Sequence, residues 1–323
     1  MLYLKIIYCF FLITIFVPKV GYSQKINTDL IKAKKLITEN KYEEAISLYQ
    51  KIYKKEKTSK IYKPYLECLK KKCEYEKAIK LVKTHYNKHG KNPSLLIDLG
   101  EIYMLKGEEK LGEKEFQKSI DEIKLNPRFS GTVASNFYSK KQYEFSLKAY
   151  LIAKKNFPNQ NYSFQISNIY SNLGQIENMY LELIELLYRS PGYMQNCKSR
   201  IGRTINDDPE NENNIILKKN IIKELQKKEN EILNDLLIWV YLQEKNFEKA
   251  IQNTISIDKR IDYQETKIFE LGEIAISNKE FEIAKKAFNY LISKTKNGIY
   301  YEESILQLNK IKNLQFYSLP IKL

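Results

Sequence analysis

Hydrophobic and small residues recur along this chain in one short pattern. A bulky residue is followed three positions later by a small residue, and four positions after that by another bulky one. In complete or partial form, the pattern reads Tyr42-Ala45-Tyr49, Tyr75-Ala78-Val82, Gly112-Phe116, Tyr143-Ser146-Tyr150, Ile176-Met179-Leu183, Phe247-Ala250 and Phe281-Ala284-Phe288. The middle positions step by 33, 34, 34 and 33 residues up to Met179, and the last two lie 34 apart. Such a period is typical of stacked helix-turn-helix units.

A second helical stripe stands ahead of each motif. Its members lie three residues apart, which places them on one face of a helix: Ala33 and Leu36, Leu66 and Leu69, Gly100 and Tyr103, Ala134 and Phe137, Ser167 and Tyr170, Ile238 and Tyr241, Gly272 and Ala275. Turn residues follow most of these stripes, as in Asn40-Lys41 and Gly107-Glu108. Two helices joined by so short a turn must lie antiparallel. Proline, which lacks the amide donor needed to continue a helix, separates several units, at Pro93, Pro127, Pro158 and Pro191.

These residues resemble the tetratricopeptide repeat. The resemblance rests on Leu99-Gly100-x-x-Tyr103, Tyr42-x-x-Ala45, Tyr143-x-x-Ser146 with Ala153 and Pro158, and Leu271-Gly272 with Phe281-x-x-Ala284. It implies an all-α, right-handed superhelical solenoid of antiparallel helix pairs, with about seven repeats plus one degenerate unit. The expected array spans 25–193 in units 26–58, 59–92, 93–126, 127–159 and 160–193, and two further units occupy 231–298.

Two segments depart from the repeat. Residues 194–230 keep two helical stretches but lose the motif, and between them lies an acidic polar loop from Asn206 to Asn213. We interpret 194–230 as a degenerate unit that keeps the stacking continuous. Residues 299–323 begin another helix without a partner, so they form either a capping helix or the start of a truncated unit.

The first 24 residues have the layout of a signal peptide. Lys5 gives a basic start, residues 6–17 are uncharged and apolar, and Pro18, Gly21 and Ser23 form a small-residue exit. The sequence therefore predicts cleavage after Ser23 or Gln24. An uncleaved anchor is the alternative, but a membrane-spanning helix needs about 18 apolar residues or more. No transmembrane span is expected in the mature chain. The whole pattern is similar to exported tetratricopeptide-repeat proteins of Gram-negative bacteria, which implies the periplasm or outer envelope, or secretion.

The charge and motif content of the chain argue against nucleic-acid binding and against catalysis, but they identify no partner. The formal net charge is +15, but lysine is mixed with glutamate along most helices, which favours a solvated surface over nucleic-acid binding. Two histidines on one helix make no catalytic set with a nucleophile and a base, and no phosphate loop or serine elbow occurs. The sequence predicts a non-enzymatic protein without a cofactor.

Two segments contain residue types that can bind a metal ion. Cys68, Cys73, His85 and His89 have near-zinc-finger spacing, but the cysteines fall within a helix and at a turn, and His85 takes a position that other units bury. We interpret His85 as a packed side chain. The acidic loop offers clustered oxygens suited to Ca²⁺, but it lacks the acidic spacing and the glycine of a calcium loop. No metal is expected at either place.

The remaining functional surface is the groove that this family lines with the first helix of each unit. Helical spacing points nine residues into it, and their mixture of aromatic, amide and charged groups suits a peptide or partner helix: Lys63, Glu67, Lys70, Glu101, Met104, Tyr138, Phe164, Asn168 and Asn172.

Three functions fit these features. The first is a non-enzymatic protein-interaction scaffold of the periplasm or cell envelope that binds a peptide or partner helix in the groove. The second is an electrostatic binder of cell-wall polymer or anionic membrane. The third is the sensing part of a longer signalling protein that continues beyond Leu323.

Overall fold

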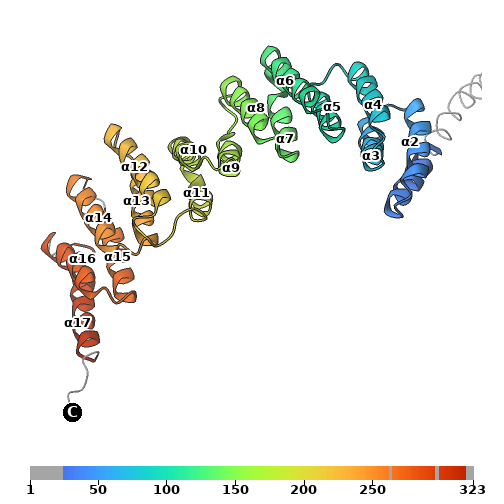
Figure 1. Cartoon of the computed structure of the whole chain (residues 1–323). Coiled ribbons are helices and arrows are strands. Elements are labelled where there is room, and N and C mark those ends of the chain that lie inside the picture. The colour runs from blue at the N-terminus through green and yellow to red at the C-terminus, as the bar shows by residue number, and fades with distance from the viewer. Residues whose placement is uncertain (1–24, 262–263, 295–297, 318–323) are drawn as a thin grey trace, which may run out of the picture. The chain divides into compact units, whose positions relative to one another are not determined.

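The fold is a series of helix pairs (Figure 1). A computed structural model describes residues 25–261, 264–294 and 298–317, and every regular element within these ranges is helical. The chain divides into two compact units, an N-terminal unit that ends at Tyr162 and a C-terminal unit that begins at Ser163. The predicted all-α class, with helices packed in sequential pairs as in a tetratricopeptide-repeat-like solenoid, is confirmed.

In the N-terminal unit, a helix over 25–38 pairs with α2 (Tyr42–Lys55). Three pairs follow: α3 (Ser59–Lys71) with α4 (Tyr75–Lys88), α5 (Ser94–Leu105) with α6 (Glu109–Leu125), and α7 (Ser130–Ser139) with α8 (Tyr143–Asn156).

In the C-terminal unit, the packed pairs are α9 (Ser163–Asn172) with α10 (Ile176–Arg189), α13 (Glu231–Gln243) with α14 (Phe247–Ile261), and α15 (Glu265–Ser277) with α16 (Phe281–Lys294). Between α10 and α13 in the sequence, α11 (Met194–Ile201) and α12 (Glu212–Lys227) take the place of a pair, but each of them packs on α10 and α13. The last helix, α17 (Tyr301–Tyr317), packs on α16. We call the earlier member of each pair its first helix and the later member its second helix, and we apply the same terms to α11 and α12.

One backbone turn joins the two helices in seven of these pairs. Each turn holds a residue with a φ between 54 and 85°, namely Asn40, Cys73, Gly107, Lys141, Gly174, Lys245 and Lys279. Two backbone hydrogen bonds close it. In the first turn, Asn40 N donates to Ile37 O and Lys41 N donates to Leu36 O. This is the Schellman geometry, which satisfies carbonyls left over at a helix end. A left-handed conformation costs a side-chain-bearing residue about 1–2 kcal/mol, and the two hydrogen bonds offset that strain.

Small residues allow the two helices of a pair to approach closely. Ala45, Ala78, Ala250 and Ala284 are completely buried, and Ser146 is buried with its hydroxyl donating to the carbonyl oxygen of Ala134 on the facing helix, at 2.8 Å. The expectation that the small motif members lie at the helix crossings is met at these positions. Bulky members fill the space on either side, including Tyr49, Phe116 and Phe288, all at most 1% exposed. Burying a large apolar side chain contributes about 1.5–3 kcal/mol.

The α11–α12 segment is built differently. Instead of the tight turn, residues 202–211 form a longer connection. Hydrogen bonds from the side chain of Asn214 hold this connection in place. Its amide nitrogen donates to the carbonyl oxygens of Asn206 and Asp208 and to the buried carboxylate of Glu244. Lys218 forms a 2.6 Å ion pair with the same carboxylate. The segment predicted to be degenerate thus has a buried polar network where the helix pairs have a short turn.

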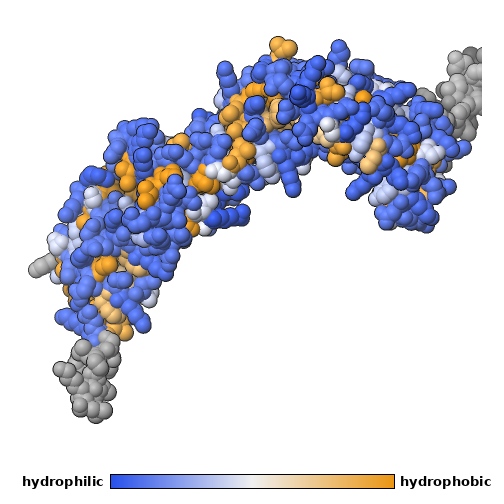
Figure 2. All heavy atoms as spheres, viewed as in Figure 1, coloured by the Kyte–Doolittle hydropathy of each residue, from blue (hydrophilic) through white to orange (hydrophobic). Residues whose placement is uncertain are grey.

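The molecular face shown in Figure 2 is mainly hydrophilic, with scattered apolar patches. None of the helices in the described ranges combines the length and the apolar character needed to cross a bilayer. The predicted signal peptide, residues 1–24, lies outside the described residues. The unit boundaries proposed from the sequence stay a prediction.

The crossing of α5 and α6 gives a direct test of the packing. A Cβ added at Gly100 would lie 2.5 Å from Phe116 Cδ1 and 2.8 Å from the carbonyl oxygen of Gly112. Alanine favours a helix over glycine by about 1 kcal/mol, whereas overpacking costs about 1–3 kcal/mol. We therefore expect Gly100→Ala to lower the urea midpoint of unfolding. As a control, Gly192→Ala adds a methyl group in open space and should change stability by less than about 0.5 kcal/mol. A midpoint for Gly100→Ala at or above that of the wild type would contradict the close crossing.

Candidate functional site

All nine residues predicted for the groove lie on first helices. Lys63, Glu67 and Lys70 are on α3, Glu101 and Met104 on α5, and Tyr138 on α7, so these six belong to the N-terminal unit. Phe164, Asn168 and Asn172 are on α9 of the C-terminal unit. The face that first helices form is therefore described separately for each unit.

Charged side chains on the N-terminal face neutralise one another. Lys70 Nζ lies 2.6 Å from Glu67 Oε1 and 2.9 Å from Glu101 Oε2, and Lys140 Nζ from the end of α7 lies 2.5 Å from the same Glu101 oxygen. Burial pushes the pKa of Glu101 upward, but Lys140 and then Lys70 outweigh it and hold that pKa below its ordinary value. The carboxylate is thus fixed as an anion between two lysines on neighbouring pairs.

A second hydrogen-bonded group continues this network. The Tyr62 hydroxyl donates to Asp98 Oδ2 at 2.8 Å, and Lys140 Nζ lies 3.5 Å from Asp98 Oδ1. Burial raises the pKa of Asp98 despite the nearby Lys140, and burial followed by Asp98 raises the pKa of Tyr62. The phenol therefore stays a donor, and α3, α5 and α7 are joined by polar contacts. Sequence reasoning missed Asp98 and Lys140, although Asp98 lies on α5 and Lys140 directly follows α7, both near the chosen residues.

His85 belongs to the packed interior of the same unit. It is 1% exposed, its ring stacks on that of Tyr62 with centroids 4.1 Å apart, and its Nδ1 lies 2.8 Å from the Tyr53 hydroxyl. Burial, followed by the charge of His89, lowers the pKa of His85 to about 4. The interpretation of His85 as a packed histidine is confirmed. Among the described residues, no three His, Cys, Asp or Glu side chains are grouped to hold a metal ion.

The other predicted residues of this face differ in role. Met104 packs within its own pair, because a Cβ on Gly112 would lie 2.9 Å from Met104 Cγ. Tyr138 is 38% exposed and its ring meets that of Tyr143 edge-on at 5.6 Å. Lys63 and Glu67 are exposed. Tyr138 and Lys63 are thus the members of the N-terminal set that a ligand meets most readily.

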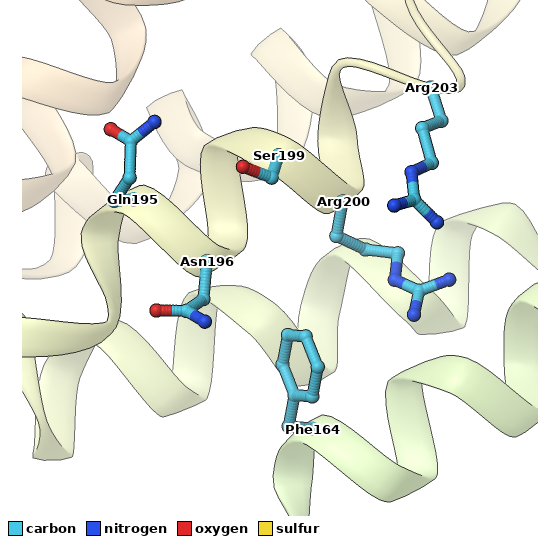
Figure 3. Close-up of a pocket in the computed structure, with 6 residues that line it drawn as sticks. All are labelled: Phe164, Gln195, Asn196, Ser199, Arg200 and Arg203. Atoms are coloured by element: carbon cyan, nitrogen blue, oxygen red, sulfur yellow. The ribbon is translucent and has the colours of Figure 1, made fainter.

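The C-terminal face contains a hollow between α9 and α11, with a volume of about 240 Å³. Phe164 forms its floor, and residues on or just after α11 form the rest of its lining, namely Gln195, Asn196, Ser199, Arg200 and Arg203. The guanidinium groups of Arg200 and Arg203 lie at the same end of the hollow, to one side of the Phe164 ring (Figure 3). Arg200 Cζ is 5.6 Å from the centroid of that ring, a distance at which a cation is attracted by the aromatic face.

The other two predicted residues follow Phe164 along α9. Asn172 Nδ2 donates to the backbone carbonyl of Asn168 at 2.7 Å. The side-chain oxygen of Asn168 is enclosed and accepts no hydrogen bond from the described residues. Phe164 is therefore the predicted residue that lines the hollow.

A second hollow of about 200 Å³ lies on the other side of α11, against α13 and α15. Lys198 Nζ stands 5.8 Å from the Trp239 ring centroid, and burial lowers the pKa of Lys198. Four apolar residues also line this hollow, namely Ile238, Leu242, Leu271 and Ile274. The remaining lining residues are Glu270 and the ion pair of Lys267 with Asp235, at 2.7 Å. We call these two spaces the arginine hollow and the tryptophan hollow.

Sequence reasoning missed the residues that distinguish these hollows. The signal was present, because residues 186–206 contain no aspartate or glutamate but include Arg189, Lys198, Arg200 and Arg203. Trp239 is the single tryptophan of the chain. Within 194–230 the acidic loop is the more prominent feature of the sequence, and the basic residues precede it on and just after α11.

The acidic loop has a structural role in the described structure. Asp207 pairs with Lys245 at 2.7 Å, and the carbonyls of Asn206 and Asp208 accept hydrogen bonds from Asn214. Lys218 also donates to the carbonyl of Pro209. Several of the oxygens weighed as calcium ligands are therefore already engaged by N–H donors.

Comparison with known proteins gives matches at the level of solved structures. No protein-family model and no curated protein matches the sequence. The C-terminal part of a TPR repeat-containing protein from Cytophaga hutchinsonii is similar, with 15% identity over 85% of this chain and 99% of that one and a TM-score of 0.32. A tetratricopeptide repeat protein from Parabacteroides merdae has 12% identity over 90% of this chain and 99% of that one, with a TM-score of 0.30.

A third similar structure is the APC/C hetero-tetramer Cut9–Hcn1. The identity is 15% over 88% of this chain and 55% of that one, and the TM-score is 0.27. At these identities and TM-scores, the similarities carry no conclusion about the partners or the activity of this chain.

The buried histidine makes stability depend on pH. The unfolded chain protonates His85 near pH 6.5, whereas the folded chain resists protonation until about pH 4. Stability contributed by neutral His85 is therefore present above pH 6.5 and is lost as pH falls through this window, by about 3 kcal/mol at most. We expect His85→Phe to flatten the fall in unfolding free energy between pH 6.5 and 4. His89→Gln removes only the smaller contribution of the His89 charge and should keep most of that fall, because burial is the main cause of the lowered His85 pKa. Equal pH profiles for wild type and His85→Phe would contradict the assignment.

Proposed function

We propose that this chain is a non-enzymatic scaffold that binds a peptide or a partner helix on the first-helix face of its C-terminal unit. The observation that carries the proposal is the pair of hollows on either side of α11. Together they offer Phe164, Trp239 and two guanidinium groups to a ligand. Tryptophan and arginine are enriched among the residues that dominate binding energy at protein interfaces.

The two faces differ in the empty volume that adjoins their charged side chains. On the N-terminal face, Glu101 is held by Lys70 and Lys140, so a ligand would have to displace contacts that already exist. On the C-terminal face, α11 supplies positive charge and adjoining empty volume. Affinity comes from the surplus of new contacts over those that are lost, and the volume beside α11 leaves room for new contacts on the C-terminal face.

The size of the hollows fits side chains of a peptide better than a whole small ligand. Pockets that bury drug-sized ligands have volumes of about 300–1,000 Å³, and each hollow here is smaller. Two adjacent hollows on neighbouring helices suit successive anchors of one segment, as in peptide or helix recognition.

We also propose that the scaffold works outside the cytoplasm, in the periplasm or associated with the cell envelope. The support is the N-terminal pattern of Lys5, an apolar run over 6–17 and a small-residue exit ending at Ser23. This arrangement is typical of a cleaved export signal.

A basic surface supports the second candidate, an electrostatic binder of anionic polymer or membrane. Residues 123–176 contain seven Lys or Arg and a single acidic residue, Glu144. Lys141, Lys148 and Lys155 are exposed; Lys148 and Lys155 are seven residues apart on α8, a spacing that places them near one side of that helix, and Lys141 lies in the turn before it. Such a contact weakens with salt, because the Debye length falls to about 3 Å at 1 M.

Site-specific crosslinking tests the main proposal. A photo-crosslinking phenylalanine analogue placed at position 239 should capture a protein from an extract of the producing cells. The same analogue at exposed Lys223 on α12 is the matched control and should give at most about one fifth of the yield, since it lies away from the expected anchors. Equal yields at the two positions, or none at 239, would count against a partner on this face. Capture that vanishes between 0.1 and 1 M salt would favour the electrostatic alternative.

A reporter fusion tests the location. Residues 1–24, fused to an enzyme that is active only after export, should give activity together with a processed product. Leu12→Asp with Ile15→Arg places two charges in the apolar run and should abolish both, because such residues oppose insertion by about 2.5–3.5 kcal/mol each. If the unaltered fusion stays in the cytoplasm, the export proposal is wrong.

A further inference from the structure

The helix α11 separates the two hollows and supplies a cation to each. Lys198 faces the tryptophan hollow, while Arg200 and Arg203 line the arginine hollow. No acidic residue occurs between Glu185 and Asp207. The local sequence therefore concentrates positive charge where the volume is available.

The arginine hollow has the chemistry of a carboxylate site. Guanidinium groups bind carboxylates through two parallel N–H donors, which is more directional than a lysine contact. Arg200 and Arg203 lie at the same end of the hollow, to one side of the Phe164 ring (Figure 3). Both guanidinium groups can therefore present N–H donors to a carboxylate bound at that end.

Polar groups beside the arginines suit a peptide backbone. The side chains of Gln195, Asn196 and Ser199 line the other end of the same hollow. Amide side chains offer both donors and acceptors, and a hydroxyl offers either. An extended peptide has unpaired N–H and C=O groups that these side chains can satisfy.

The tryptophan hollow fits an apolar side chain. Five of its nine lining residues are apolar, namely Trp239, Ile238, Leu242, Leu271 and Ile274. The other four are Lys198, Glu270 and the ion pair of Lys267 with Asp235. An indole ring gives a large contact area at a low cost in side-chain entropy. The hollow on one side of α11 thus suits a carboxylate of the ligand, and the hollow on the other side suits an apolar side chain.

We propose that the first-helix face of the C-terminal unit binds an extended acidic peptide segment. Its carboxylates lie against Arg200 and Arg203, and a neighbouring apolar side chain lies against Trp239. This inference rests on the proposed scaffold function and specifies the chemistry of the partner. Charge complementarity selects the occupant, because opposite potentials attract the ligand and disfavour a basic or neutral one.

Peptide titrations with the purified full chain test this inference. Three fluorescein-labelled ten-residue peptides share one leucine and differ at three positions, which carry Glu, Gln or Lys. The Glu peptide should bind at least about tenfold more tightly than the Gln peptide, and the Lys peptide should bind least. Arg203→Gln should weaken the Glu peptide about fivefold or more, and Arg200→Gln with Arg203→Gln should weaken it further.

The matched control removes the same charge elsewhere in the unit. Lys219→Gln with Lys223→Gln, on the exposed side of α12, should change the affinity by less than about twofold. Helical circular dichroism and the melting midpoint report whether each variant folds. Arg203→Glu guards against a purely structural loss, because it should improve binding of the Lys peptide while weakening that of the Glu peptide.

The outcomes separate this inference from the scaffold proposal. Equal binding of the Glu and Gln peptides, or an equal loss in the α12 control, overturns acidic recognition and leaves the scaffold standing. If the partner crosslinked at position 239 binds but all three peptides fail, the acidic-peptide inference alone is overturned. If no peptide binds and no crosslink forms, the scaffold proposal fails as well. Binding to phosphatidylglycerol vesicles that the double arginine variant abolishes, without peptide binding, would identify a membrane ligand instead.

Discussion

The close crossing of two helices at small residues is the constraint on which the structure depends. At the α5–α6 crossing, Gly100 has Phe116 and the carbonyl of Gly112 against it, with no room for a methyl group. Each crossing brings two helices together over a short turn, and the turn in turn fixes where the second helix begins. A regular period of 33 or 34 residues follows, because the same geometry must be rebuilt in every unit.

This regular spacing sets which side chains meet between neighbouring pairs. Residues about one repeat apart come together, as in the contacts of Tyr62 with Asp98, Lys70 with Glu101, and Tyr53 with His85. In the N-terminal unit, polar side chains at these positions bond to one another, and these contacts hold neighbouring helix pairs together. A residue predicted to face a ligand then becomes part of the protein's own network.

In the C-terminal unit, the tight turn and close helix crossing are missing between α11 and α12. Between α11 and α12 the tight turn is replaced by a loop that Asn214, Lys218 and Glu244 hold in place. The short α11 is flanked by two hollows, and its cations line them. Regular packing accounts for the scaffold, and the irregular α11–α12 segment accounts for the surface on which we place binding.

The sequence by itself determined the helix pairs, the turns at residues such as Asn40 and Gly107, and the burial of His85, because periodicity and turn chemistry are local properties. It also placed Phe164 on the correct helix. Only the tertiary structure decided that Glu101 is neutralised by two lysines and that Arg200 and Trp239 line hollows. Ion pairs and hollows depend on side-chain positions in units some 30 to 40 residues apart, and a repeat pattern fixes the helix face without fixing the partner that each side chain finds there.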